Sequence, residues 1–307
     1  MSERARIERL QKIFSNERAQ GVALGIGDDA AVLHPPPGPL VWTVDEQVEG
    51  SHFRLDWLSF EDVGYRATMA AASDLAAMGA VPLWALASLV LPKIFSEESF
   101  EAIARGQRAA VDALGASLVG GNLASGPCVS LATSWIGRAE RPLGRAGARP
   151  GDGVYLCGAV GLAAAGLRSL QQGIGVADEA LRAWRRPRAL IAEGLRMTSV
   201  AAACIDLSDG LAGDASHIAR ASGVGLVLFA SALAAAAPGA LFDSAAALGC
   251  DAMQLALHGG EDYALLCTSA VPIDGFSLVG EVIEGQGVVL REGAELRPLA
   301  GGFDHFA

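Results

Sequence analysis

The chain of 307 residues is long enough for two domains with hydrophobic cores, because 51% of its residues are hydrophobic. Its formal net charge of −11, without clustered Lys and Arg, argues against a nucleic acid as the main partner. Lys12 and Lys93 are the only lysines and neither lies in a Gly-x-x-x-x-Gly-Lys-Ser/Thr loop, which excludes a P-loop NTPase. An anionic substrate would therefore require a metal ion.

The first half of the chain alternates apolar segments with amphipathic ones, as an α/β domain does. Ser59-Phe-Glu-Asp62 is a capping-box pattern, and Ser96 before two glutamates also suits the N-terminus of a helix. The elements that we expect, in chain order, are helix 3–15, strand 41–45, helix 59–79, strand 83–91, helix 96–114 and strand 129–137.

A polar segment rich in turn-forming residues, 138–152, follows, and we place a domain boundary there, giving domains 1–138 and 139–307. The second half begins a new series of apolar and amphipathic segments. The elements that we expect there are strand 153–157, helices 161–172, 188–202 and 210–221, strands 225–229 and 263–268, and a hairpin-like pair, 276–282 and 287–291.

Two long uncharged stretches, 113–137 and 221–242, are each broken by turn signals, so we expect buried elements and no membrane partner. The five cysteines show no Cys-x-x-Cys spacing, and most lie in apolar stretches, which favours buried free thiols in a reducing compartment. The N-terminal Met-Ser-Glu-Arg-Ala-Arg lacks the apolar core of a signal peptide. We therefore expect a cytoplasmic protein.

Short aspartate motifs recur along the chain beside glycine, alanine and apolar residues, where an ionised carboxylate is costly unless a cation or hydrogen-bond donors compensate it. Each motif also has an ordinary structural interpretation. Asp28-Asp29 can form an Asx turn, and Asp74 can lie on the exposed stripe of an amphipathic helix.

The later motifs are open in the same way. Ser208-Asp209 can cap the following helix, although capping is compatible with metal ligation, and a helix N-terminus beside carboxylates and metal favours a bound phosphate. The two glycines before Glu261-Asp262 fit either a tight turn or the close approach of a ligand.

The order and spacing of the motifs resemble the thiamine-monophosphate kinase family. The motifs that carry the resemblance are Gly-Ile-Gly-Asp-Asp-Ala-Ala-Val, Val-Glu-Gly-Ser-His-Phe, Ser-Asp-Leu-Ala-Ala-Met-Gly-Ala, Gly-Gly-Asn, Arg-Ala-Gly-Ala-Arg-Pro-Gly-Asp, Ile-Asp-Leu-Ser-Asp-Gly-Leu, Gly-Gly-Glu-Asp-Tyr and Gly-Phe-Asp-His-Phe. They are collinear with the family from about residue 20 to the end. The wider superfamily of aminoimidazole-ribotide synthetase-like enzymes shares the aspartate pattern without the whole set.

The resemblance implies the two-domain α/β (α+β) fold of that superfamily. Residues 1–138 would form an N-terminal α/β domain that binds metal and ATP and dimerises, and residues 139–307 a C-terminal α/β domain that binds substrate. The implied reaction is ATP-dependent, in-line transfer of a phosphoryl group to thiamine monophosphate, giving thiamine diphosphate without a covalent nucleophile. Several Mg²⁺ ions would be the cofactors, and the implied partners are ATP, thiamine monophosphate and a second copy of the chain.

The family's functional residues correspond to three sets of positions in this chain. The implied metal ligands are Asp28, Thr43, Asp45, Asp74, Asn122, Asp206 and Asp209. The implied ATP contacts are Gly121, Asn122, Arg145 and Ser208. The implied contacts to thiamine monophosphate are His52, Glu261 and Phe303, of which Phe303 could instead be an anchor in the core.

The chain departs from the family pattern at three of these motifs. Asn122 stands where the family has Asp, and it offers a neutral carbonyl oxygen in place of a charged carboxylate. Val44 stands where the family has Thr, and Ala146 replaces a Ser that often follows the ATP-contacting Arg. These changes keep open a second hypothesis, a nucleotide- or thiamine-phosphate-binding relative with weakened catalysis.

Overall fold

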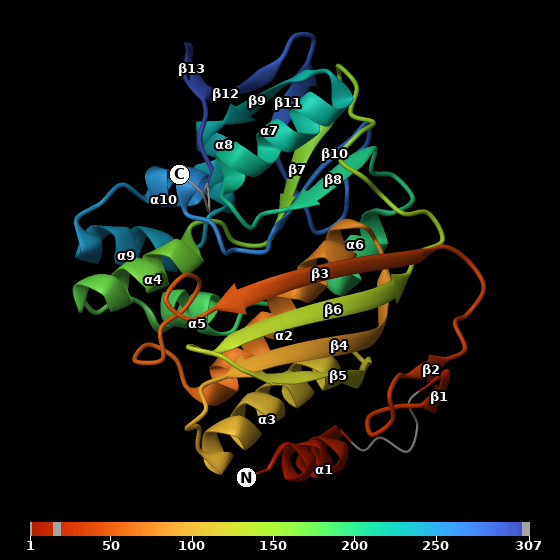
Figure 1. Ribbon diagram of the computed structural model, residues 1–307. Helices are drawn as coiled ribbons and strands as arrows, with labels where there is room; N and C mark the ends of the chain where they lie inside the picture. The colour runs from red at the N-terminus through yellow and green to blue at the C-terminus, as the bar shows by residue number, and fades with distance from the viewer. Residues whose placement is uncertain (1, 15–19, 303–307) are drawn as a thin grey trace. The chain divides into compact units, whose positions relative to one another are not determined.

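The structure is a computed structural model that describes residues 2–14 and 20–302 (Figure 1). The chain forms two compact units. The first unit comprises Met1–Leu75 and Ala80–Glu140, and the second comprises Ala76–Gly79 and Arg141–Ala307.

The first unit is an α/β structure built on one mixed sheet. Its elements are α1 (Glu3–Phe14), β1 (Val22–Leu24), β2 (Val32–Leu33), β3 (Leu40–Val48), α2 (Phe60–Ala77), β4 (Val81–Leu91), α3 (Glu97–Ala113), β5 (Ser117–Ser125) and β6 (Ser130–Arg138). Strands β3, β6, β4 and β5 form a four-stranded sheet in that order, in which only β4 and β5 are parallel, and β1 and β2 form a small sheet of their own.

Helix α2 packs on one face of the four-stranded sheet, which we call the helix-covered face. The fully buried Trp135 of β6 marks this face, because its indole N–H donates to the Thr68 carbonyl of α2 over 3.0 Å. Side chains alternate along each strand, so the neighbouring positions point to the opposite, outer face. Figure 1 shows the strands in front of α2, with the outer face toward the viewer.

The second unit is built on a seven-stranded sheet of order β13-β12-β9-β11-β7-β10-β8. Its strands are β7 (Gly153–Cys157), β8 (Ala203–Asp206), β9 (Gly225–Phe229), β10 (Leu265–Ser269), β11 (Ser277–Ile283), β12 (Gly287–Glu292) and β13 (Glu295–Leu299). Its helices are α4 (Leu162–Gln172), α5 (Asp178–Arg185), α6 (Ile191–Met197), α7 (Leu211–Ser222), α8 (Ala230–Ala236), α9 (Gly239–Leu248) and α10 (Ala252–His258).

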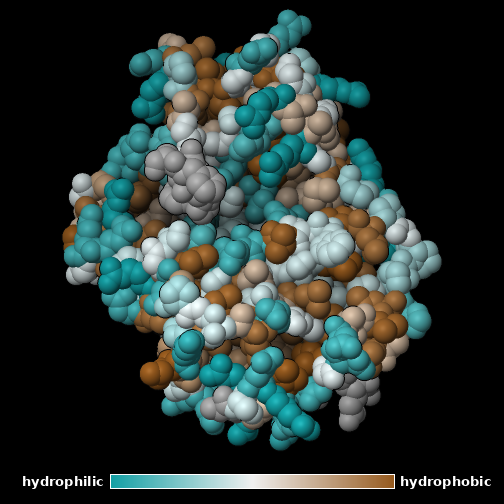
Figure 2. Space-filling model, viewed as in Figure 1, coloured by the Kyte–Doolittle hydropathy of each residue, from teal (hydrophilic) through white to brown (hydrophobic). Residues whose placement is uncertain are grey.

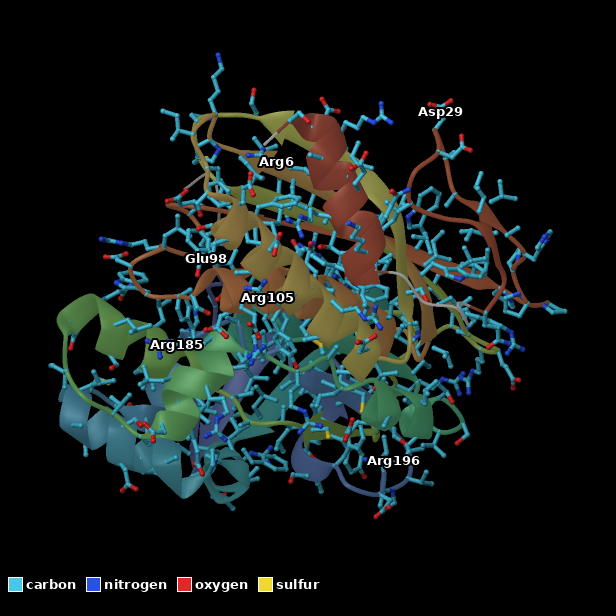
Figure 3. All side chains as sticks on the ribbon, turned by 90° about the horizontal axis from the view of Figure 1, so that it is seen from below. Arg6, Asp29, Glu98, Arg105, Arg185 and Arg196 are labelled. Atoms are coloured by element: carbon cyan, nitrogen blue, oxygen red, sulfur yellow. The ribbon has the colours of Figure 1, made fainter. Side chains whose placement is uncertain are left out.

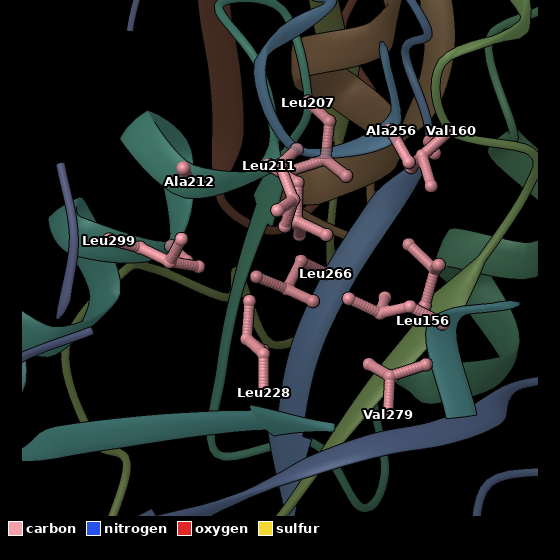
Figure 4. Packing of buried hydrophobic residues seen from close by; sticks show 14 of the residues in the cluster. Leu156, Val160, Leu207, Leu211, Ala212, Leu228, Ala256, Leu266, Val279 and Leu299 are labelled. Carbon is pink, nitrogen blue, oxygen red and sulfur yellow. The ribbon is translucent and has the colours of Figure 1, made fainter. Parts of the chain in front are cut away.

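Two hydrophobic cores lie in the second unit. The larger core includes Leu156 of β7, Leu228 of β9, Leu266 of β10 and Leu211 of α7 (Figure 4). The other core contains Cys157, Cys204 and Cys267. All five cysteines are free, these three are buried, and burial raises the pKa of the Cys267 thiol to about 12. The expectation of buried free thiols is therefore confirmed for three of the five.

The predicted helix 188–202 is too long at both ends, because α6 comprises only Ile191–Met197. Helix α6 ends at Met197, and the N–H groups of Val200 and Ala201 bond to the Met197 carbonyl in a turn. The Ala202 N–H bonds to the Thr268 carbonyl of β10. Pairing with this distant strand overrides the helical preference of the local sequence. The strand β8 that follows was absent from the prediction.

Within the described residues, no single helix is long and apolar enough to cross a membrane. Helices α8 and α9 reach that length and composition only together, and they are bent by 103° relative to each other.

Candidate functional site

Thr43, Asp45 and Asp74 form a polar group on the helix-covered face of the first unit. Thr43 and Asp45 are two residues apart on β3 and so share a face, and Asp74 lies on α2. The Thr43 hydroxyl donates a hydrogen bond to Asp74 Oδ2. Burial, and then the charge of Asp74, raises the pKa of Asp45, so a cation at this group would favour the ionised pair.

Asn122 lies on the other face of the same sheet. The register places Asp45, Thr133, Ala87 and Gly121 in one row across the four strands. Asn122 is in the next row, so its side chain points to the outer face, away from Asp45. Gly121 is required by packing, because a Cβ there would lie only 1.8 Å from the Ala87 carbonyl oxygen.

A cavity of about 930 Å³ in the first unit contains the other two predicted metal ligands of that unit. Asp28 and Asn122 both line it, and so does Val44. Asp28 Oδ1 accepts from the Asp29 N–H over 2.9 Å, and Asp29 projects from the loop between β1 and β2 (Figure 3). Val44 and Asn122, two positions at which the chain departs from the family pattern, therefore line the same cavity.

His52 lies in a turn that follows β3. The imidazole Nδ1 of His52 accepts from the Val48 N–H over 3.1 Å, and the backbone N–H of His52 donates to the Val48 carbonyl over 2.9 Å. Because Nδ1 accepts a hydrogen bond, a neutral His52 ring carries its proton on Nε2.

The predicted ligands of the second unit lie where β8 passes into α7. Asp206 is the last residue of β8 and is buried, and Asp209 lies in the loop before Gly210, which is the N-cap of α7. No side chain among residues 2–14 and 20–302 caps α7, and Asp209 directly precedes its N-cap. This loop combines groups that bind a cation with a helix N-terminus that favours an anion.

Asp214 is a third carboxylate at this loop, and the sequence motifs had not indicated it. It is 2% exposed in the first turn of α7, and its Oδ2 accepts from the Asp209 N–H over 3.1 Å. Burial, followed by the charges of Asp209 and Asp206, raises the pKa of Asp214 to about 7. A divalent cation bound at this loop would offset the repulsion between these carboxylates.

Glu261 lies in the loop from α10 to β10, beside Ser208. The Glu261 N–H donates to the Ser208 carbonyl over 2.7 Å, and the Tyr263 N–H donates to Leu207 over 2.9 Å. Glu261 and Tyr263 have φ values of 61° and 50°, a conformation that costs a non-glycine residue about 1–3 kcal/mol. The expected strand 263–268 therefore begins only at Leu265.

Arg145 lies in a loop that is organised by Ser222 of α7. The Ser222 hydroxyl accepts from the N–H groups of Gly147 and Ala148 over 3.1 Å each, and it donates to the Arg145 carbonyl over 3.2 Å. A lone serine 77 positions away gives no signal in the sequence, so only the structure identifies Ser222 as the residue that orders this loop.

Phe303 lies outside the described residues, but the segment before it packs on α7. A Cβ on Gly213 would lie 2.8 Å from both the Gly301 carbonyl oxygen and the Gly302 Cα. The absence of a side chain at Gly213 therefore allows this segment to approach the helix that follows Asp209.

The predicted metal ligands do not form a closed coordination shell in the described part of the chain. No group of three or more His, Cys, Asp or Glu side chains there could hold a metal ion. The first unit provides Asp28, Thr43, Asp45, Asp74 and Asn122, and the second provides Asp206 and Asp209. Each unit thus presents a partial set of oxygen ligands.

The comparisons with known proteins identify relatives that cover nearly the whole chain. The family described as AIR synthase related protein, N-terminal domain, matches residues 27–139. A thiamine-monophosphate kinase of Mycobacterium tuberculosis is 36% identical over 305 residues, which cover 98% of this chain and 91% of that protein.

Two solved structures extend the likeness to the whole fold. The thiamine-monophosphate kinase of Stenotrophomonas maltophilia aligns with a TM-score of 0.81 at 33% identity, covering 94% of this chain and 96% of the other. The protein named AaThiL, solved with AMPPCP and TMP, aligns with a TM-score of 0.81 at 31% identity, covering 99% and 97%.

The fold and the matched N-terminal domain define an AIR synthase-related protein, which confirms the predicted fold class. Identity of 36% over nearly the full length narrows this class further. The chain belongs to the thiamine-monophosphate kinase family.

Proposed function

We propose that the protein transfers the γ-phosphoryl group of ATP to thiamine monophosphate, giving thiamine diphosphate, with Mg²⁺ ions held by its aspartates. The observation that carries the proposal is the 206–210 loop, where two carboxylates adjoin the uncapped N-terminus of α7. Family membership supports the same activity, and the relative AaThiL was solved with an ATP analogue and TMP.

The roles of the chain's residues follow from charge. Bound Mg²⁺ would neutralise the two phosphate-bearing reactants and orient them for in-line transfer. Asp45 and Asp74 of the first unit, and Asp206 and Asp209 of the second, would hold the ions. Ser208 and Arg145 would bind ATP, and the donors of Arg145 suit phosphate oxygens.

Three residues would contact thiamine monophosphate. His52 and Glu261 would offer polar groups, and Phe303 an aromatic face for the cationic thiazolium ring. None of these side chains needs to act as a nucleophile, because positioning and charge stabilisation account for most of the catalysis in phosphoryl transfer.

A direct assay tests the activity. The purified chain, incubated with ATP, Mg²⁺ and thiamine monophosphate, is expected to form thiamine diphosphate, measured by chromatography of the thiochrome derivatives. Asp209→Asn should lower kcat/KM by at least about 100-fold, since it removes a charge that acts on the transferring group. An inactive native chain across millimolar Mg²⁺ would contradict the proposal.

The outward position of Asn122 favours a second candidate function, a phosphate-binding relative with weak catalysis. Asn122 lines the same cavity as Asp28, and it offers a neutral carbonyl oxygen there in place of the family's carboxylate. Asn122→Asp should lower the Mg²⁺ concentration for half-maximal rate by about ten-fold, because it restores a hard anionic oxygen ligand.

Ser125→Asp is the matched control, because it adds the same charge at the exposed end of the same strand. If the native chain makes no product and Asn122→Asp does, the second candidate is the correct one. Equal Mg²⁺ requirements in the native chain and in Asn122→Asp would show that position 122 holds no ion.

We also propose that the protein is a homodimer of the cytoplasm. The outer face of the four-stranded sheet supports the dimer, because Trp42 is 72% and Val44 65% exposed there, and Leu86 lies beside them. Figure 2, in which this face is toward the viewer, shows brown and pale residues over the strands. Five free cysteines are consistent with a reducing compartment.

A further inference from the structure

Asp262 is a partly buried residue whose carboxyl group connects two distant parts of the second unit. Its Oδ2 accepts from the Gly161 N–H over 2.7 Å, and its Oδ1 accepts from the Ala163 N–H over 3.2 Å. Gly161 is the N-cap of α4 and has no side chain to cap it. Asp262 thus caps a helix that begins about 100 positions earlier in the chain.

A side chain at Gly161 could not replace this contact. Gly161 has φ 82°, and a Cβ there would lie 2.6 Å from the Ala256 N atom of α10. The N-terminus of α4 is therefore pressed against α10, and its N–H groups depend on an acceptor from another segment. The carboxylate of Asp262 also interacts favourably with the positive end of the α4 dipole.

The residues on both sides of Asp262 are held in an unfavourable backbone conformation. Glu261 and Tyr263 have positive φ values, and their N–H groups bond to Ser208 and Leu207. Such residues keep this conformation only where the surroundings fix it. Asp262 lies between them, and both of its carboxyl oxygens accept hydrogen bonds from the N-terminus of α4. The loop is therefore attached to α4 as well as to the 207–208 segment.

We propose that Asp262 is a positioning residue that anchors the 258–263 loop to α4 and so holds Glu261 in the orientation in which it meets thiamine monophosphate. The substrate part of this inference rests on the proposed function. The anchor itself is a property of the second unit alone.

The test compares Asp262→Ala with Asp262→Asn in the full-length protein. The alanine variant loses both acceptors, and we expect KM for thiamine monophosphate to rise by about ten- to a hundred-fold with a smaller change in kcat, because Glu261 is displaced. The asparagine variant keeps one acceptor oxygen and should give an intermediate KM. A variant that only folds less well would lose apparent kcat at unchanged KM.

Ser96→Ala is the matched control for the loss of a helix cap. Ser96 caps α3 of the first unit by accepting from the Ser99 N–H over 3.0 Å, whereas the 258–263 loop belongs to the second unit. We expect its KM for thiamine monophosphate to equal that of the native protein. An equal rise in KM in this control, or an unchanged KM in Asp262→Ala, would overturn the inference that Asp262 positions Glu261 for thiamine monophosphate.

Hydrogen exchange tests the anchor without any activity. Exchange of the Glu261 and Tyr263 amides should be at least about ten-fold faster in Asp262→Ala than in the native protein, since the loop opens more often. Unchanged exchange at both amides would overturn the anchor. A native protein that forms no thiamine diphosphate would contradict the proposed function, and the exchange rates would still decide whether Asp262 anchors the loop.

Discussion

Asn122 shows how much of a residue's role depends on the face of the sheet it occupies. The sequence identified the loss of a carboxylate, but not where the amide lies. The strand register places it on the outer face with Val44, while Asp45 lies on the helix-covered face, where Thr43 donates a hydrogen bond to Asp74. The aspartates that looked equivalent in sequence therefore belong to different surroundings.

Asp74 and Asp28 resolve two of the alternatives that the sequence left open. Asp74 is partly buried and accepts a hydrogen bond from Thr43, so it does not belong to a freely exposed helical stripe. Asp28 Oδ1 accepts from the N–H of the next residue, Asp29, whereas an Asx turn bonds to the N–H two residues on, and Asp28 also lines the cavity.

The titration of Asp262 should appear in the pH dependence of stability. Although the residue is partly accessible, burial of the carboxyl raises its pKa to about 7, against the lowering effect of the Gly161 and Ala163 N–H groups. Between pH 4 and 7 the unfolded chain has lost this proton and the folded chain keeps it. The free energy of unfolding therefore falls as pH rises, by at most about 4 kcal/mol from this group.

Urea unfolding from pH 4 to 8 measures this effect in the native protein and in Asp262→Asn. Asp214 contributes a slope of the same sign to both proteins, so the difference between their curves isolates Asp262. We expect the asparagine variant to lose less stability across this range. Parallel curves would show that the carboxyl of Asp262 titrates normally.

At the scale of elements, helices α2 and α3 cross with backbone in contact with backbone. A Cβ on Gly106 would lie 1.9 Å from the Glu61 carbonyl oxygen, and a Cβ on Gly64 would lie 2.0 Å from the Ile103 carbonyl oxygen. Glycine weakens an isolated helix, but at these two positions the lack of a side chain allows the two helices to cross closely.

Gly106→Ala should therefore destabilise the first unit. Alanine favours helix, but its methyl group would force α2 and α3 apart, and we expect a loss of about 1–3 kcal/mol in urea unfolding followed by circular dichroism. Gly239→Ala is the control, because a Cβ at that helical position meets no atom within 4 Å. Equal stabilities of the two variants would contradict the close crossing.

Helix α7 provides a second element-scale prediction, because Gly213 receives the segment that leads to Phe303. Gly213→Ala should displace Gly301 and Gly302 and raise KM for thiamine monophosphate by about ten-fold, since it moves a substrate contact. The melting temperature should change less than in Gly106→Ala, because the Gly213 Cβ would lie 2.8 Å from the nearest backbone atom, against 1.9 Å at Gly106. An unchanged KM would show that residues after 302 do not contribute to substrate binding.

At the scale of the whole molecule, the exposed apolar face of the first unit predicts self-association. Trp42, Val44 and Leu86 are exposed apolar side chains, and their burial against a second copy would stabilise a dimer. Light scattering during size-exclusion chromatography should give twice the mass of one chain.

Leu86→Lys should shift this species toward the monomer, because it places a charge in the proposed interface. Leu278→Lys is the matched control, as Leu278 is a leucine of similar exposure on β11 of the second unit. A monomeric native protein, or equal dissociation of the two variants, would contradict an interface on the sheet face.

The sequence by itself determined the class of protein, most of the long elements and the identity of the motifs. These signals are local: helical and strand periodicity, caps, and aspartates beside glycine can be read within a few residues. Helices α2, α3 and α7 lie close to the predicted ranges for this reason.

Only the tertiary structure decided which residues meet. The contacts of Asp74 with Thr43, of Ser222 with the Arg145 loop, and of Asp262 with α4 join positions 31, 77 and 101 residues apart. Strand register and close glycine contacts fix these pairs, and neither leaves a periodic pattern in the chain. The aspartate motifs gave the chemistry of the proposed site, and packing determined how each unit presents it.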